Sequence, residues 1–143
     1  MNSQICVDAS LALKLVLSEP DSDRAELQWQ NWLKARLEIV TPFLFIYETS
    51  SVLRNRVYRR EITQREADEA LRLLASLGIV CLHPPAIWQP AWELAGRFNR
   101  PTVYDSFYLA LSQHQGCPFW TGDRRLYNAV KNELRWVHWL GQT

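Results

Sequence analysis

Short apolar runs separated by helix-length segments constrain the fold of this chain more than any other feature. The runs are residues 5–7, 38–40, 79–82, 118–120 and 136–140. Each has the length and composition of a buried strand. Strands that alternate with helices predict a mostly parallel sheet covered by helices on both faces. We therefore expect an α/β protein, a three-layer α/β/α sandwich on a mostly parallel central sheet.

The segments between these runs predict helices. Their expected bounds are residues 11–17, 21–37, 41–60, 63–77, 90–99 and 104–115, with a further helix starting at residue 123. Asp21 is expected to cap the second helix. Thr41-Pro42 is expected to start the third, because Thr favours the N-cap and Pro the first helical position. Thr63 and Glu66 form a capping-box pattern.

The bulk properties indicate one ordinary globular domain over residues 1–143. The net charge of +1 predicts neither nucleic-acid nor membrane binding, so any basic surface must be local. No apolar run approaches the roughly 18 residues that a membrane span needs, and no signal-peptide pattern begins the chain. Three widely spaced cysteines indicate buried reduced thiols rather than a disulfide framework or a zinc site. A cytoplasmic protein is the resulting expectation.

Four carboxylates stand where a strand or loop leads into a helix, each among apolar or small residues. They are Asp8, Glu48, Asp105 and Asp123. Burying an isolated charge costs several kcal/mol or more, and no comparable row of basic residues accompanies them, which indicates a shared cation. Asp8 and Asp123 directly follow predicted strands, at the sheet edge where α/β proteins bind ligands. Glu48 and Asp105 lie on helices and would have to point toward that edge.

The chemistry of such a cluster is narrow. Two carboxylates about 5 Å apart repel by roughly 3 kcal/mol at an effective dielectric constant of about 20, so four require protonation or a cation. Oxygen-only ligation suits Mg²⁺ or Mn²⁺ rather than zinc. These ions suit phosphodiester hydrolysis, because they neutralise the phosphate and lower the pKa of an attacking water.

Each acid also has a structural explanation when it is taken singly. Asp123 suits a helix N-cap, Asp105 suits the positive end of its helix, and Glu48 suits a partly exposed helical position. Asp8 is the hardest to explain in this way, because it directly follows Ile-Cys-Val on a buried strand. Composition alone leaves the choice open.

Four short motifs in order resemble those of the PIN-domain ribonucleases, and within them the VapC-like toxins of toxin–antitoxin pairs. The motifs are Val7-Asp8-Ala9-Ser10-Leu11-Ala12-Leu13-Lys14, Glu48-Thr49-Ser50-Ser51-Val52-Leu53, Tyr104-Asp105-Ser106-Phe107-Tyr108-Leu109-Ala110-Leu111 and Thr121-Gly122-Asp123-Arg124-Arg125-Leu126. The third is the most specific, and the resemblance covers essentially the whole chain. Trp120 before the fourth motif is a less usual choice for the family.

The resemblance implies a Mg²⁺- or Mn²⁺-dependent endoribonuclease that hydrolyses RNA by a metal-activated water. It implies 5′-phosphate and 3′-hydroxyl ends, a homodimer and inhibition by a cognate antitoxin protein. Carried over, Asp8, Glu48, Asp105 and Asp123 are the catalytic and metal-binding residues, with Asp8 and Asp105 nearest the first ion. Ser10 and Thr121 are expected to orient carboxylates from behind them.

Basic residues around the motifs are candidate RNA contacts. Lys14, Arg124 and Arg125 are expected to bind substrate phosphates, although an exposed lysine needs no such role. Four arginines end the Glu48 helix, either as favourable C-terminal charges or as an RNA-binding flank: Arg54, Arg56, Arg59 and Arg60. Trp29 and Trp32 share a face with Ala25, which favours a place in the core. If partly exposed, they would offer a groove to an antitoxin helix.

Two other enzyme or phospho-acceptor classes on a similar sheet are disfavoured. A haloacid-dehalogenase-type phosphatase needs a second acid where Ser10 stands, and a receiver domain needs an Asp where His83-Pro84 stand. A partner-binding PIN scaffold and an RNA-processing nuclease outside toxin–antitoxin systems stay open. The sequence does not identify the RNA target.

Overall fold

Five parallel strands form the central sheet of the computed structural model, which describes residues 3–142. They are β1 (Gln4–Val7), β2 (Glu38–Pro42), β3 (Val80–Leu82), β4 (Phe119–Thr121) and β5 (Val137–Trp139). The order across the sheet is β3-β2-β1-β4-β5, and every neighbouring pair is parallel. The predicted parallel sheet is confirmed.

Helices connect the strands. They are α1 (Ala9–Val16), α2 (Ser22–Lys34), α3 (Leu44–Tyr58), α4 (Gln64–Ser76), α5 (Trp88–Arg97), α6 (Tyr104–Gln115) and α7 (Arg124–Val130), with short 3₁₀ turns η1 (Pro85–Ile87) and η2 (Leu140–Gln142). Within residues 3–142, none of these helices has the length and apolar character to span a membrane.

The two faces of the sheet bury different side chains, as the alternation of a strand requires. Ile5 and Val7 of β1 pack with the indole of Trp29 and other side chains of α2. Cys6, between them, faces the opposite side and packs in the cluster that contains Tyr108 of α6. Helices therefore cover both faces, and the predicted three-layer arrangement is confirmed.

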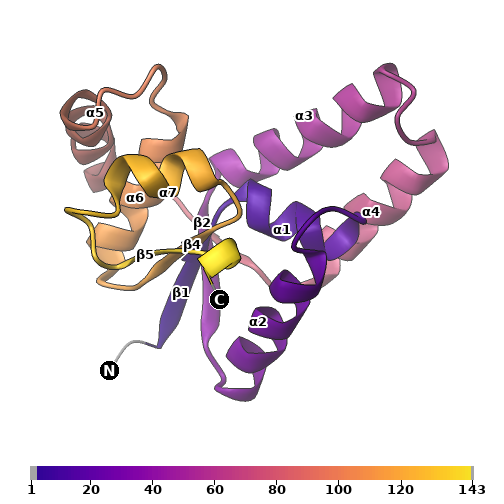
Figure 1. Cartoon of the computed structure of the whole chain (residues 1–143), viewed down its shortest axis with the longest axis horizontal. Helices are drawn as coiled ribbons and strands as arrows, with labels where there is room; N and C mark the ends of the chain where they lie inside the picture. Colours follow the sequence, from indigo (N-terminus) through magenta and orange to yellow (C-terminus); the bar gives the residue numbers. More distant parts are fainter. Residues whose placement is uncertain (1–2, 143) are drawn as a thin grey trace.

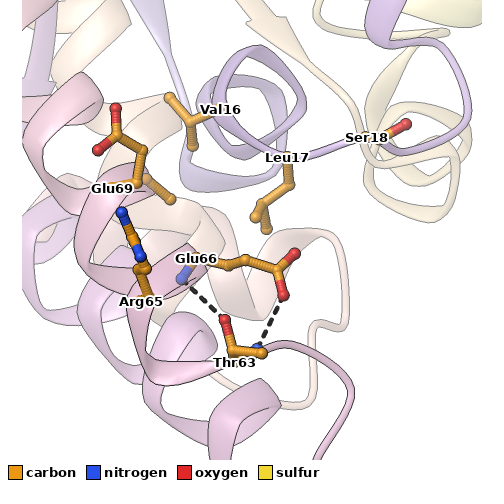
Figure 2. Close-up of a pocket in the computed structure, with 8 residues that line it drawn as sticks. Val16, Leu17, Ser18, Thr63, Arg65, Glu66 and Glu69 are labelled. Atoms are coloured by element: carbon orange, nitrogen blue, oxygen red, sulfur yellow. Dashed lines mark hydrogen bonds between the residues drawn. The ribbon is translucent and has the colours of Figure 1, made fainter.

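Helices α3 and α4 form a hairpin that extends from the sheet, with α1 beside it (Figure 1). The sequence of α4 fixes its start. The Thr63 hydroxyl accepts a hydrogen bond from the Glu66 amide at 3.0 Å, and the Glu66 carboxylate accepts one from the Thr63 amide at 3.1 Å (Figure 2). The predicted capping box is confirmed.

One predicted helix start is wrong, and one predicted side-chain cap is absent. Thr41 and Pro42 end strand β2, where they pair with Cys81 and Leu82, and α3 begins at Leu44. Strand pairing outweighs the local preference of Thr-Pro for a helix start. Asp21 stands before α2 but has a left-handed backbone, with φ of 67°, and its side chain caps no amide.

The chain reverses direction across the sheet between β1 and β4. From β1 the order runs outward through β2 and β3, and then the chain crosses to β4 and β5 on the other side of β1. Such a switch point leaves space beyond the carboxyl ends of the two central strands, where α/β proteins bind ligands. Asp8 follows β1 directly, and Asp123 lies two residues after β4.

Candidate active site

A cavity of about 340 Å³ contains all four predicted acids. Asp8 comes from the end of β1, Asp123 from the start of α7, Glu48 from α3 and Asp105 from the first turn of α6. The remaining lining residues are Ala9, Ser10, Leu13, Lys14, Glu19, Val52, Arg56 and Tyr108. The fold thus brings together four acids that are far apart in the sequence.

Asp8 is buried and held by three donors. Its Oδ1 accepts from the Ser10 hydroxyl at 2.7 Å and from the Leu11 amide at 3.0 Å, which also caps α1. Its Oδ2 accepts from the Thr121 hydroxyl at 2.5 Å. Both hydroxyls accept amide bonds in turn, Ser10 from Gly122 and Thr121 from Asp123. This network orients Asp8 and ties the end of β1 to the loop after β4.

Burial raises the pKa of Asp8 to about 6, against the lowering effect of its three donors, and the charge of Asp105 raises it further. A carboxyl with this pKa is mostly ionised at neutral pH, but it carries a cost of desolvation. A nearby cation would remove that cost.

Glu48 accepts a hydrogen bond from the phenol of Tyr108, at 2.6 Å from Oη to Oε1. Burial raises the pKa of Glu48, and the neighbouring Asp105 raises it further. The pKa of Tyr108 is raised as well, first by burial and then by Glu48, so its hydroxyl remains a donor. Tyr108 therefore fixes the carboxylate of Glu48.

Asp105 and Asp123 are each held on one oxygen. The Arg100 guanidinium lies 3.4 Å from Oδ2 of Asp105, while burial and the charge of Asp123 raise the Asp105 pKa. Asp123 caps α7, accepting at Oδ1 from the amides of Arg125 and Leu126. The capping explanation for Asp123 is therefore true of this structure, yet the same carboxylate also lines the cavity.

The donor set suits a hard divalent cation in its chemistry. All four groups are carboxylates, and within residues 3–142 Glu48 Oε2, Asp105 Oδ1 and Asp123 Oδ2 have no hydrogen-bond partner. Among those same residues, however, no three His, Cys, Asp or Glu side chains are positioned to hold a metal ion. Mutual repulsion keeps ionised carboxylates apart. Binding an ion would therefore require these side chains to turn toward it.

The predicted basic contacts divide into two groups. Lys14 lines the cavity and donates to the Pro20 carbonyl at 2.8 Å. Arg124 and Arg125 are exposed and, in the part of the chain that the structure describes, are not among its lining residues. The Arg124 guanidinium instead lies 5.4 Å from the ring centre of Trp139.

Trp29 and Trp32 are only 3% and 6% exposed. Their interpretation as core is confirmed, and the condition for a groove that binds a partner helix is not met. One prediction on the cysteines needs correction. Of the three cysteines, Cys6 and Cys117 are buried but Cys81 is only half-buried, and all three are free thiols.

Sequence reasoning missed several residues that contact the site. Tyr108 stands three positions after Asp105 in the third motif, so its place one helical turn away was available as a signal. Arg100 and Glu19 had no such signal, because each lies outside the motifs. Arg56 was considered only as one of four arginines in a flank, whereas it alone of the four lines the cavity.

A larger cavity of about 520 Å³ lies between the end of α1 and the start of α4, lined by Val16, Leu17, Thr63, Glu66 and others (Figure 2). Its acids already have partners. Glu66 closes the capping box, and Glu69 pairs with Arg72 at 3.0 Å. It therefore lacks the convergent free carboxylates of the smaller cavity.

The parallel sheet and the acidic cavity at its switch point are typical of α/β proteins that bind ligands beyond the carboxyl ends of their strands. The sequence matches the family model described as the PIN domain over residues 5–132, so the chain belongs to the PIN-domain family. PIN domains are generally nucleases, so we describe the chain as a PIN nuclease. A comparison with curated proteins finds no significant match.

Solved structures share the fold. PAE2754 from Pyrobaculum aerophilum superposes with a TM-score of 0.70 at 21% identity, covering 97% of this chain and 85% of the other. VapC20 (Rv2549c) of Mycobacterium tuberculosis, described as a sarcin-ricin-loop-cleaving toxin, superposes with a TM-score of 0.64 at 20% identity. That match covers 89% of this chain and 95% of the other. At these identities the likeness concerns the fold.

Proposed function

We propose that residues 1–143 act as one PIN-like domain that is a Mg²⁺- or Mn²⁺-dependent endoribonuclease, the toxin of a toxin–antitoxin pair. The observation that carries this proposal is the convergence of Asp8, Glu48, Asp105 and Asp123 on one cavity in a chain of the PIN family. The same four acids lie in the motifs that resemble the VapC-like toxins.

The proposed role of each acid follows from its contacts. Asp8, fixed by three donors, is the most rigid ligand, and Asp105 lies close enough to raise its pKa. Tyr108 holds Glu48 and the first amides of α7 hold Asp123, so each presents its other oxygen. A bound divalent cation supplies charge neutralisation at the phosphate and lowers the pKa of a coordinated water. Without it, four converging negative charges would repel the phosphodiester.

The proposed substrate is RNA, and its identity is open. VapC20 is described as cleaving the sarcin-ricin loop. That loop is one reasonable substrate to try here, beside tRNA and mRNA.

The partners that we propose are a cognate antitoxin and a second copy of the chain, in the cytoplasm. A surface of exposed apolar side chains supports the homodimer: Trp88 is 75% exposed and Trp92 68%, one turn apart on α5. Phe43, which is 46% exposed, stacks on His83. His83 and Trp88 both line another cavity, separate from the acidic one. Apolar groups gathered in this way favour a protein interface. Light scattering of the wild type and of Trp88→Glu should give a dimer and a monomer, respectively.

A scaffold without catalysis is the second candidate. The absence of a preformed three-residue metal cluster within residues 3–142 is the observation that favours it. Tight partner binding together with failure to cleave any RNA would support this alternative.

The decisive test is cleavage of total RNA by purified protein in Mg²⁺, Mn²⁺ or EDTA, with sequencing of the new ends. We expect cleavage in either metal that leaves 5′-phosphate ends. Asp8→Asn and Asp105→Asn should abolish it while the variants stay folded. Activity that persists in EDTA, or in either variant, would exclude this mechanism.

A further inference from the structure

The cavity that holds the four acids also has basic residues in its lining. Glu48, Val52 and Arg56 follow one another at intervals of four residues on α3, and all three line the cavity. Eight residues of helix place Arg56 about 12 Å from Glu48 along the axis. Lys14 also lines the cavity, and its ammonium group donates to the Pro20 carbonyl. The cavity therefore contains a carboxylate cluster and two cations.

Glu19 forms an ion pair with the guanidinium of Arg56 when no RNA is bound. The two side chains form an ion pair between the α1–α2 loop and α3, with 17% of the Glu19 side chain and 28% of that of Arg56 exposed. Within residues 3–142, neither side chain has another polar partner. Arg56 is thus a cation of the cavity wall that is neutralised by a single carboxylate.

The loop that carries Glu19 does not depend on this ion pair for its shape. The Ser22 hydroxyl donates to the Leu17 carbonyl at 3.1 Å and accepts from the Glu19 amide at 3.0 Å. The Lys14 ammonium bond to Pro20 fixes the middle of the loop at 2.8 Å. Removing the charge of Glu19 should therefore release Arg56 while the loop keeps its position.

We propose that Arg56, together with Lys14 of the same cavity, is a binding subsite for a second backbone phosphate of the RNA strand. In the proposed subsite the RNA phosphate displaces the Glu19 carboxylate from its ion pair with Arg56. A guanidinium binds phosphate through two parallel hydrogen bonds, so a phosphodiester is a suitable competitor for a carboxylate. A strand whose scissile phosphate lies at the acids would extend its neighbouring phosphates along the cavity. This subsite rests on the proposed ribonuclease function.

The test is the affinity of a fluorescein-labelled single-stranded RNA, measured by anisotropy in Ca²⁺. This ion also takes carboxylate oxygens as ligands, so it offsets the charge of the four acids, and it replaces Mg²⁺ and Mn²⁺ to limit cleavage. We expect Arg56→Gln to weaken binding about tenfold and Glu19→Gln to tighten it about threefold to tenfold. In the double variant Glu19→Gln should have no effect, because its benefit acts through Arg56. Arg56→Gln should also reduce the slope of log affinity against log salt by about 0.7.

The exposed pair Arg97–Glu133, whose residues do not line the cavity, is the matched control. Arg97→Gln and Glu133→Gln should leave RNA affinity unchanged. If Arg56→Gln unfolds, Arg56→Lys, which keeps the charge but not the paired donors, should weaken binding less. Unchanged or weaker binding by Glu19→Gln would overturn the proposal. If Glu19→Gln tightened binding equally in the Arg56→Gln background, the proposal would also be overturned, because the effect would then come only from the change in net charge.

Failure of the subsite and failure of the ribonuclease proposal give different results. Metal-dependent cleavage without the Glu19 and Arg56 pattern removes the subsite alone. The affinity pattern without cleavage in any metal keeps the subsite as an RNA contact and removes the catalytic proposal.

Discussion

Replacing Asp8 by Asn should stabilise the metal-free protein although it removes a proposed catalytic residue. Burial raises the folded-state pKa of Asp8 from 3.8 to about 6. A difference of about two pKa units means that the ionised carboxyl costs the folded state about 3 kcal/mol near neutral pH. Asn carries no charge, still accepts from the Leu11 amide as an N-cap residue, and can offer its amide to the Thr121 hydroxyl.

The pH dependence gives the sign of this effect. Between about pH 4 and pH 6 the folded protein binds more protons at Asp8 than the unfolded chain, so the free energy of unfolding falls as pH rises. Above about pH 6.5, ionisation of Asp8 lowers the free energy of unfolding no further. In Asp8→Asn this contribution disappears, and only the smaller declines from Glu48 and Asp105, whose pKa values are also raised, should remain.

Urea unfolding in EDTA, followed by tryptophan fluorescence at pH 4, 5, 6 and 7, measures the difference. We expect Asp8→Asn to exceed the wild type by up to about 3 kcal/mol at pH 7 and to approach it at pH 4. Asp68→Asn, on the exposed face of α4, is the control and should follow the wild type. Equal or lower stability of Asp8→Asn at pH 7, or an unchanged pH slope, would refute this view of the buried acid.

Three further substitutions test separate parts of the structure. Tyr108→Phe removes the donor that holds Glu48, and it should weaken Mn²⁺ affinity about tenfold to a hundredfold in a calorimetric titration. Gly122→Ala would place a Cβ 3.2 Å from the backbone C and O of Ser10 and 2.8 Å from Cε of Lys14. The lysine can move but the backbone yields less easily, so cleavage should fall and chemical unfolding should show a loss of about 1–3 kcal/mol. Thr63→Ala breaks the capping box outside the site, and it should cost about 1 kcal/mol in urea unfolding while RNA cleavage stays unchanged.

The parallel sheet could be predicted because its strands are short apolar runs between helices. Local signals failed where pairing or loop geometry opposed them. Thr41-Pro42 has the composition of a helix start, but in the structure both residues pair with β3. Asp21 has the composition of a cap, yet its left-handed backbone directs its carboxylate toward Arg24, 3.8 Å away, instead of the helix amides.

The four acids of the site could be proposed from sequence because each lies in a recognisable motif. The contacts of Ser10 and Thr121 with Asp8 were also predicted, because both residues lie in the motifs. The contacts of Tyr108 and Arg56 were not, because they join residues far apart in the chain. Tyr108 reaches Glu48 across 60 positions, and Arg56 reaches Glu19 across 37. The predicted contacts of Arg124 and Arg125 rested on their nearness to Asp123 in sequence. Both lie in the first turn of α7, where they are exposed and do not line the cavity.

The central claim is that the four carboxylates of the cavity bind a divalent cation even when no RNA is present. Titration of Mn²⁺ into metal-free protein, followed by electron paramagnetic resonance, measures this directly. The wild type and the control Asp68→Asn should bind Mn²⁺, and Asp8→Asn and Asp105→Asn should lose measurable binding. No binding by the wild type, or equal binding by both cavity variants, would contradict the account.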